Sequence, residues 1–447
     1  MRQRERAQGA HFGRWLLLIS LAALAVRVAY GLSRDHLALG GDAYFYSVGA
    51  DLLVAGRGFI EPATVITPPV EQSASHPPLY LLYLAVASFL DPTSGSTQMV
   101  HMLWSTLLGT ASVVLIGLVG RKLAGPRCGL IAAAVAAVYP NLWVHDGIVM
   151  SETMAIFATV VLLLLAYRYW ERPSAARAVG LGLCCGLAAL SRAELLLAVP
   201  LLLVPLLLFT RQVRFPRRVG WLVAGGAAAA AALSPWVVFN LGRFEEPVVL
   251  THAFGYTIAA ANCDATYGGP NIGFKDYGCA HDVAVATQAP GQDPSQREND
   301  VRRETMRYVN DNLDRVPAVV AARLGRIAGV YRTEQDITLD AFFSNRERWV
   351  ARGIMYGYWA VAPLALIGAL VLRRRRVPVF PLAAFPAVVL LAVAVTFAQP
   401  RYRAPAEPAL ILLGAVAVDA ALRRLTPRRK VPASTSAGRA ERVAVPA

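Results

Sequence analysis

Long apolar runs alternate with short polar segments along the whole chain. The first run extends from Leu16 to Tyr30, behind a basic segment that contains Arg2, Arg4, Arg6 and Arg14. About 20 apolar residues are enough for a helix to cross a bilayer. The pattern predicts an all-α polytopic membrane protein with about ten transmembrane helices.

The connections between the expected helices alternate along the chain: one is rich in arginine, and the next is acidic or of mixed charge. The expected helices cover about 15–32, 98–120, 127–145, 150–168, 177–191, a run ending at 211, 219–240, and three runs ending at 373, 399 and 423. Because arginine and lysine clusters favour the cytoplasmic side, the N-terminus is expected inside the cell. The apolar stretch PPLYLLYLAVASFL is short for a span and predicts an extracytoplasmic interfacial helix.

The same pattern divides the chain into five expected segments. They are a cytoplasmic basic N-terminus (1–14), a transmembrane catalytic domain (15–240) with an outer loop (33–97), a long extracytoplasmic loop (241–350), C-terminal transmembrane helices (351–422) and a cytoplasmic disordered tail (423–447). The first apolar run resembles a signal sequence, but no convincing small-residue cleavage site follows it, and Arg27 interrupts it. We therefore expect a retained first helix.

Composition supports a membrane protein and argues against a nucleic-acid binder. The chain is 56% hydrophobic and 16% charged, whereas soluble domains carry about 25% charged residues. The net charge of +15 would suit nucleic acid, but the arginines lie in short clusters between apolar runs, as membrane topology requires. No nucleic-acid partner is expected.

The expected topology places a set of polar residues on the extracytoplasmic face, several of them at helix ends. Ionisable groups at membrane depth are costly, so they are candidates for function. The set comprises Asp42, His76, Asp146, Glu152, Arg192, Glu194, Gln399, Arg401, Tyr402 and Arg403. The alternative is that each simply faces water at a helix end.

Asp42 follows a Gly-Gly turn and precedes the helical stretch AYFYSVGADLLVAG. Its carboxylate could cap that helix by accepting backbone N–H bonds. It could instead be a general base that takes the proton of an attacking hydroxyl. Tyr44 could line a sugar or lipid path, or belong to an interfacial aromatic belt.

The segment HDGIVMSET places Asp146 and Glu152 on either side of a turn between two helices. Asp146 or Ser151 could cap the second helix. Alternatively, one of the carboxylates approaches Asp42 to orient the acceptor, share a proton or hold a divalent cation beside a phosphate. The sequence contains no D-x-D triplet, so the metal ligands are unknown, and a divalent cation stays open as a cofactor.

Arginines on the outer side suit an anionic phosphate, because the guanidinium presents forked, permanently charged donors. The candidates are Arg27, Arg192, Arg401 and Arg403, the last two in QPRYRAPAEP. Arg27 could instead snorkel to the interface, and QPRYR could be an ordinary proline-broken turn.

Five cysteines are present, of which Cys128, Cys184 and Cys185 lie in apolar surroundings as small hydrophobes. Cys263 and Cys279 lie in the long loop, where an extracytoplasmic location permits a disulfide. Two free thiols are the alternative. A bond that closes this loop would stabilise it by roughly 3 kcal/mol.

Five stretches, in order, resemble the family 39-like membrane glycosyltransferases of the GT-C superfold, which include protein O-mannosyltransferases and bacterial lipid A aminoarabinose transferases. They are GGDAYFYSVGADLLVAGRGF, SHPPLYLLYLAVASFL, HDGIVMSET, SRAELLLAVPLLL and QPRYRAPAEPAL, within about 15–422. Larger members continue beyond this point with a soluble domain, which leaves the acceptor undefined.

The resemblance implies transfer of a sugar from a polyprenyl-phosphate donor to a glycan, lipid or protein acceptor at the extracytoplasmic face. It places Asp42 on the family's catalytic carboxylate, Glu152 on a position that is often acidic, and His76 on one that is often basic. Tyr44, His76, Glu194 and Tyr402 are then expected to bind substrate. The expected location is a bacterial plasma membrane.

Two other classes of protein share many helices and intramembrane charges. A transporter or lipid flippase is the main alternative, although here the polar groups crowd one face and do not gather at the midplane between repeats. A noncatalytic assembly protein is the other.

Overall fold

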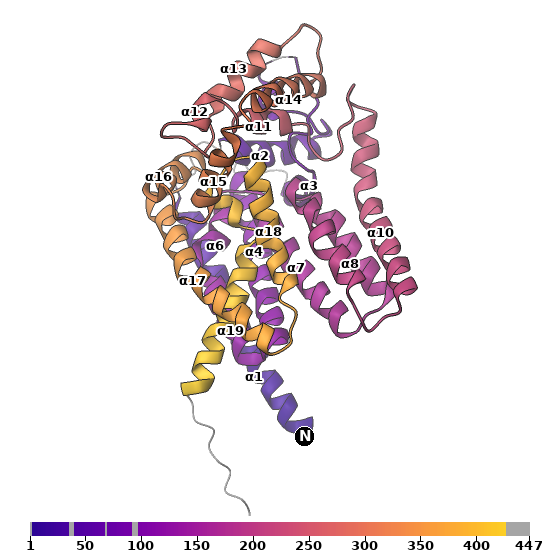
Figure 1. Ribbon diagram of the computed structural model, residues 1–447, viewed down its shortest axis with the longest axis vertical. Helices are drawn as coiled ribbons and strands as arrows, with labels where there is room; N and C mark the ends of the chain where they lie inside the picture. Colours follow the sequence, from indigo (N-terminus) through magenta and orange to yellow (C-terminus); the bar gives the residue numbers. More distant parts are fainter. Residues whose placement is uncertain (1, 35–39, 68, 92–96, 426–447) are drawn as a thin grey trace, which may run out of the picture.

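The computed structural model describes residues 2–34, 40–67, 69–91 and 97–425, and it is built from helices (Figure 1). Within these ranges, paired extended backbone is limited to one antiparallel bridge between Ile60 and Gln72. The expected all-α fold class is therefore confirmed. The segment 426–447, where most of the expected tail falls, lies outside the described residues.

The lower part of the molecule is a helical bundle (Figure 1). It consists of α1 (Arg2–Ser33), α4 (Thr97–Ala124), α5 (Pro126–Val138), α6 (Pro140–Gly147), α7 (Glu152–Glu171), α8 (Ala175–Ala189), η2 (Ala193–Leu197), η3 (Val199–Leu203), α9 (Val204–Leu208), α10 (Phe215–Leu241), α17 (Arg348–Arg374), α18 (Phe380–Val395) and α19 (Glu407–Leu425). The helices begin and end close to the boundaries expected from the apolar runs, although α1 already begins at Arg2.

Five helices of the described chain are long and apolar enough to cross a membrane: 11–33 within α1, 98–124 within α4, α7, α10 and α17. The pair α5 and α6, bent by 47°, makes a sixth if it is one span. Together they make this a multi-pass membrane protein. Helix α8, the segment 193–208 and α18 are apolar but shorter, so the count of about ten spans stays a prediction.

Small residues bring two helix pairs into close contact. A Cβ atom on Gly182 of α8 would lie 1.9 Å from the carbonyl oxygen of Gly225 in α10, and one on Gly368 of α17 would lie 1.8 Å from that of Leu413 in α19. Such approach requires glycine, as in other membrane helix interfaces. It stabilises α8 on α10 and α17 on α19.

The upper part of the molecule is a helical cap (Figure 1). Its elements are α2 (Gly41–Val54), η1 (Pro62–Val65), α3 (Leu79–Leu90), α11 (Phe254–Ala259), α12 (Asp264–Tyr267), α13 (Tyr277–Thr287), α14 (Pro294–Asp311), α15 (Val316–Ile327), α16 (Thr333–Phe343) and η4 (Pro400–Arg403). The segment 241–350, expected as one long loop, therefore contains six helices. Helix α14 starts at a capping box of Asp293 and Gln296 with proline in its first turn, which is a strong start signal.

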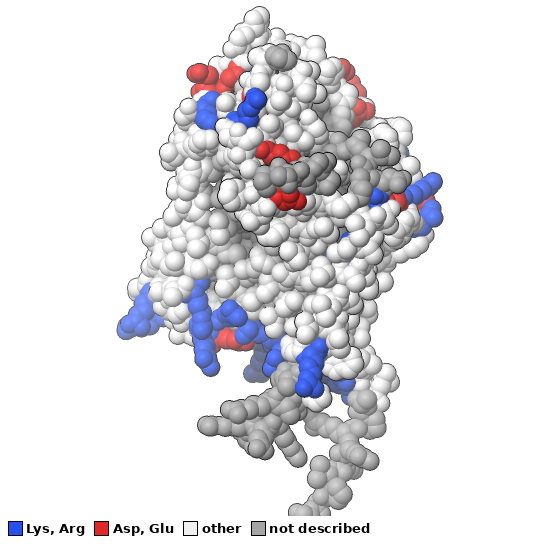
Figure 2. Space-filling model, turned by 180° about the vertical axis from the view of Figure 1, so that it is seen from behind, with Lys and Arg blue, Asp and Glu red and all other residues white. Residues whose placement is uncertain are grey.

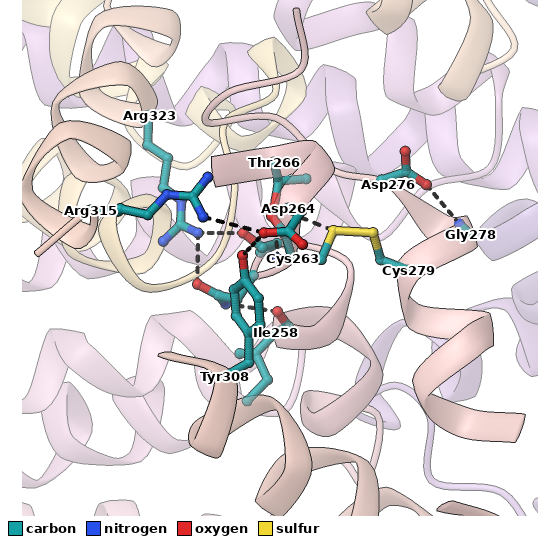
Figure 3. Close-up of a disulfide and its surroundings, with 12 residues drawn as sticks. Ile258, Cys263, Asp264, Thr266, Asp276, Gly278, Cys279, Tyr308, Arg315 and Arg323 are labelled. Carbon is teal, nitrogen blue, oxygen red and sulfur yellow. Dashed lines mark hydrogen bonds and ion pairs between the residues drawn. A yellow bond between two sulfur atoms is a disulfide. The ribbon is translucent and has the colours of Figure 1, made fainter. Parts of the chain in front are cut away.

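A disulfide between Cys263 and Cys279 joins the start of α12 to α13 (Figure 3). Beside it, Asp264 accepts a hydrogen bond from Tyr308 at 2.8 Å and one from Arg315 at 3.2 Å. Arg323 of α15 donates to the carbonyl oxygen of Ala261 at 2.6 Å. These contacts tie α12, α14 and α15 together, so this part of the cap is a packed layer.

Basic side chains gather at the end of the bundle that lies away from the cap. Figure 2 shows lysine and arginine at the lower end, below a broad belt with few charged groups. The last turns of four helices supply such residues: Arg121 and Lys122 in α4, Arg168 in α7, Arg373 and Arg374 in α17, Arg423 and Arg424 in α19. This distribution fits a bundle whose basic end is cytoplasmic.

Candidate functional site

Asp42 lies in the first turn of α2, where the cap meets the bundle. Gly41 before it has φ +54°, a conformation that favours glycine. The N-cap residue is Gly40, and the start of α2 has no side-chain cap. The Asp42 carboxylate instead accepts a hydrogen bond from Arg401, with 2.9 Å between Oδ2 and Nη2. The capping alternative is therefore not what this side chain does.

Arg401 lies in η4, the short turn between α18 and α19. Besides Asp42, it approaches Glu152, with 3.7 Å between Nε and Oε1. Its guanidinium lies 5.2 Å from the centre of the Tyr402 ring. One arginine thus joins the first outer helix to the start of α7.

A second arginine continues the cluster on the other side of Glu152. Arg192 Nη1 lies 2.7 Å from Glu152 Oε1, and its Nε is paired with Glu194. Its guanidinium lies 5.3 Å from the Tyr402 ring. Glu152 is fully buried and its Oε2 has no hydrogen-bond partner among the described residues. It is therefore placed to hold Arg192 and Arg401 side by side.

His76 completes the group around Asp42. Its Nε2 lies 3.7 Å from Asp42 Oδ1, and its ring packs against Phe45 and Tyr46 at centroid distances of 4.8 and 5.0 Å. Burial lowers the pKa of His76 below its usual value, although the charge of Asp42 acts in the opposite direction. The Asp42 side chain keeps 30% of its surface exposed, so it remains open to a substrate.

Lys275, in the loop between α12 and α13, belongs to this site and was not among the residues expected from the sequence. Its Nζ donates to Gln399 Oε1 and to the Tyr277 hydroxyl, each at 3.0 Å. The segment GFKDYGC carries no recognisable signal for this role, because only the folding of the cap onto η4 brings Lys275 near Asp42.

Electrostatics set the protonation of Asp42 and Lys275. Burial alone would raise the pKa of Asp42, but the charges of Arg401, His76 and Lys275 outweigh it, and the pKa lies below its usual value. Burial lowers the pKa of Lys275 to about 7, with Arg401 acting in the same direction. At neutral pH the carboxylate is therefore ionised, while the amine is close to half-protonated.

Four candidate residues from the sequence lie outside this cluster. Arg27 and Asp146 form their own buried pair, with 2.9 Å between Nε and Oδ2, and Thr153 donates to Asp146 at 2.7 Å. Arg403 pairs with Glu407 at 3.2 Å. Tyr44 is partly buried, and within the described chain it makes no hydrogen bond or ring contact with the cluster.

These contacts bear on the roles expected for three of the residues. Arg27, Asp146 and Arg403 are each at most 3% exposed. Their contacts link α1 to α6 and stabilise the start of α19. The geometry therefore favours a part in packing for them, and their expected roles in phosphate binding and catalysis are supported by no contact with Asp42.

No three histidine, cysteine, aspartate or glutamate side chains gather as metal ligands in the part of the chain that the structure describes. The carboxylates nearest to Asp42 are already paired with arginine. A cofactor is therefore not established for this site.

Comparisons with known proteins show what this chain is similar to. Residues 75–239 match the family model described as dolichyl-phosphate-mannose-protein mannosyltransferase. Over most of its length the chain also has the fold of GT-C membrane glycosyltransferases of known structure. The matched segment contains His76, Glu152, Arg192 and Glu194. The GT-C resemblance expected from the sequence motifs is therefore confirmed. No curated protein matches the chain.

Solved structures agree on the GT-C fold. The oligosaccharyltransferase of Archaeoglobus fulgidus, in complex with zinc and sulfate, matches with TM-score 0.56 and 15% identity over 92% of this chain and 49% of its own. The same enzyme with an inhibitory peptide and a dolichol-phosphate matches with TM-score 0.54 and 17% identity over 93% and 50%. This chain thus spans about half the length of that enzyme.

A bacterial protein is also similar. ArnT from Cupriavidus metallidurans, bound to undecaprenyl phosphate, matches with TM-score 0.43 and 16% identity over 90% of this chain and 77% of its own. That likeness is too distant to support any argument about this GT-C chain.

Proposed function

We propose that this protein transfers a sugar from a polyprenyl-phosphate donor to an acceptor at the extracytoplasmic face, with Asp42 as the general base. The observation that carries the proposal is the Asp42 carboxylate, which is held by Arg401 and remains partly exposed at the junction of cap and bundle. The match to a mannosyltransferase family over 75–239 supports the type of reaction.

The chemistry at Asp42 follows from its lowered pKa. A weak base cannot deprotonate a hydroxyl in advance, but the transition state of glycosyl transfer is oxocarbenium-like and does not require it. The acceptor oxygen bonds to the anomeric carbon while the bond from that carbon to the phosphate oxygen breaks. The hydroxyl proton becomes acidic as the new bond forms, and Asp42 takes it. Polyprenyl phosphate leaves with the bonding electrons.

The donor phosphate requires positive charge at the leaving oxygen. Arg401 and Arg192 are the permanently charged cations around Glu152 and Asp42, and Lys275 adds a partial positive charge. We propose that these three groups stabilise the phosphate. Forked guanidinium donors suit phosphate oxygens. Glu152 then keeps the two arginines in position, and Glu194 and Tyr402 limit the directions in which Arg192 can point.

Location and orientation complete the proposal. The basic ends of α4, α7, α17 and α19 lie away from the cap. We therefore place the N-terminus in the cytoplasm and the cap outside a bacterial plasma membrane. In this arrangement 15–240 forms most of the catalytic membrane domain, 241–350 covers the site, and 351–422 supplies Arg401.

A transfer assay tests the proposal. Purified full-length protein in lipid nanodiscs is incubated with radiolabelled polyprenyl-phosphate sugars and a membrane extract as the source of acceptor. We expect one donor to be consumed and its label to appear on an acceptor. Movement of an intact donor across reconstituted vesicles without breakage of its sugar–phosphate bond would instead show a flippase.

A further inference from the structure

A cavity of about 420 Å³ lies in the cap, between the first outer segment and helices α11, α13 and α14. Sites for small molecules commonly enclose about 300–1,000 Å³. Its walls include Glu61, Glu71, His252, Tyr256 and Glu298. None of these residues contributes to the cluster around Asp42, so the cavity is a separate feature of the cap.

Hydrogen bonds join the cavity wall to the segment that carries His76. The backbone N–H of His252 donates to the carbonyl oxygen of Ala74 at 3.1 Å, and the Thr251 hydroxyl donates to that of Ser75 at 2.6 Å. His76 is the next residue, and its ring faces Asp42 at 3.7 Å. The cavity wall therefore packs against the segment that positions His76 next to the proposed base.

The carboxylates in the cavity wall can accept more hydrogen bonds than the protein donates to them. Glu61 Oε2 accepts from the hydroxyls of Ser73 and Ser75, and Glu298 Oε2 accepts from the backbone N–H of Tyr256 at 2.9 Å. A carboxylate has about four lone-pair sites. Unused acceptor capacity therefore remains on both, and it suits a ligand that carries several hydroxyl donors.

His252 also lacks partners for its side chain. Both ring nitrogens are shielded from solvent, and neither has a hydrogen-bond partner in the described ranges. Burial lowers the pKa of His252 to about 4, so the neutral ring offers one donor and one acceptor. Buried polar atoms are normally satisfied, so the unpartnered His252 ring is an unusual feature of this wall.

The cavity wall differs in charge from the proposed site of the donor phosphate. The cavity wall contains Glu61, Glu71 and Glu298 but a single arginine, Arg297, which is paired with Glu71. Such a wall disfavours a phosphate group. Tyr256, which lines the cavity, stacks with Tyr277 at a centroid distance of 6.2 Å, so the wall also contains an aromatic surface.

We propose that this cavity binds the acceptor, and that the acceptor is a neutral, hydroxyl-rich glycan. The inference rests on the proposed transferase function, in which Asp42 takes a proton from the acceptor hydroxyl. In this proposal that hydroxyl belongs to the glycan. The cavity in the cap then selects the acceptor, while Arg192 and Arg401, where the cap meets the bundle, bind the anionic donor.

Binding is tested without activity, on an array that carries neutral oligosaccharides, phosphorylated glycans and lysine-rich peptides. The full-length protein is used as wild type and as Ala284→Trp, Val285→Trp and Ala286→Trp. Ala284 and Val285 line the cavity, whereas Ala286 lies on the same helix, is exposed and does not line it. Val285 is 58% exposed, so a tryptophan there narrows the cavity without disturbing the core.

We expect neutral oligosaccharides to bind wild type and Ala286→Trp equally, and about tenfold more weakly to the two variants that fill the cavity, a difference of about 1.4 kcal/mol. Asp42→Asn should bind the same glycans as wild type. Binding of lysine-rich peptides or phosphorylated glycans in place of neutral ones would overturn the proposal, as would unchanged binding in both Ala284→Trp and Val285→Trp. If glycans bind in the cavity but no polyprenyl-phosphate sugar is consumed, the proposed transferase function is wrong, whereas glycan binding by the cavity is still supported.

Discussion

At the scale of single residues, contacts separate candidates that looked equivalent in the sequence. Asp42 could have been a helix cap, and Asp146 another carboxylate of the same kind. The structure pairs Asp42 with Arg401 on a partly exposed surface and pairs Asp146 with Arg27 in the protein interior. Charged pairs buried away from solvent are costly to break, so the pair of Asp146 and Arg27 stabilises the fold.

Asp42→Asn should lower transfer by roughly 10²–10⁴-fold, the range for loss of a general base. The amide keeps the size of the side chain and can still contact Arg401, but it cannot take a proton. Donor binding and thermal stability should stay close to wild type. Steady-state transfer with a radiolabelled donor measures the effect, and turnover at the wild-type rate would leave Asp42 without a catalytic role.

Arg401→Ala and Arg403→Ala should have different consequences, although the two residues are neighbours in QPRYR. Arg401 contacts Asp42 and Glu152, so its loss should weaken donor binding while the fold is kept. Arg403 is buried against Glu407 and the carbonyl oxygen of Ile327, and its loss leaves a buried carboxylate unpaired at a cost of about 3–5 kcal/mol.

Donor binding and melting temperature, measured on both arginine variants, separate the two effects. Arg401→Lys should recover donor binding only in part, because lysine lacks the fork of the guanidinium. Full donor affinity in Arg401→Ala would show that the donor phosphate does not bind to this arginine.

Lys275 should make stability depend on pH above neutrality. Its pKa is lowered to about 7 in the folded protein, against about 10.4 for an unperturbed lysine. Between these values the unfolded chain binds more protons, so stability should rise with pH, by at most about 1.4 kcal/mol per pH unit. Below pH 7 both states are protonated and the gain is absent.

Lys275→Met should remove this dependence, and apparent melting temperatures between pH 6 and 9 provide the measurement. The melting temperature of wild type should rise across that range relative to the variant. Parallel curves for the two proteins would show that Lys275 is not desolvated.

At the scale of elements, close packing and capping signals are the deciding features. The glycines of the stretch GLGLCCG in α8 differ in what they face. A Cβ atom on Gly182 would meet the backbone of α10, whereas one on Gly180 would meet nothing within 4 Å. The same helix therefore contains a test position and its control.

Gly182→Ala should destabilise the protein by about 1–3 kcal/mol, as overpacking does, because α8 must move away from α10. Gly180→Ala should be neutral or stabilising by up to about 1 kcal/mol, since alanine has the better helix propensity. Melting temperatures in the same detergent compare the two. Equal stability of both variants would contradict the close contact at Gly182.

At the scale of the whole molecule, the bundle has a basic end and a capped end. Single cysteines introduced at Asp91 and Gln292 should react with an impermeant maleimide in intact cells, whereas those at Arg211 and Arg374 should react only after permeabilisation. The buried Cys128 and Cys185 should contribute little background. Labelling of position 374 from outside would reverse the proposed orientation.

The sequence by itself determined the long apolar helices of the bundle and the positions of the basic clusters at their ends. Hydropathy and the clustering of arginine depend only on residues that are neighbours in the chain. The helices α1, α4, α7, α10 and α17 could therefore be found without tertiary structure. The capping box at α14 is local in the same way, because it depends on two residues three positions apart.

Only the tertiary structure decided which polar residues meet. Asp42 and Arg401 are 359 positions apart, and Lys275 comes near them only when the cap closes over η4. Whether Arg27 faces lipid, substrate or Asp146 likewise depends on how α1 packs against α6. Local hydropathy cannot specify these partners, because an ion pair depends on the distance between side chains in the folded molecule and not on their spacing along the chain.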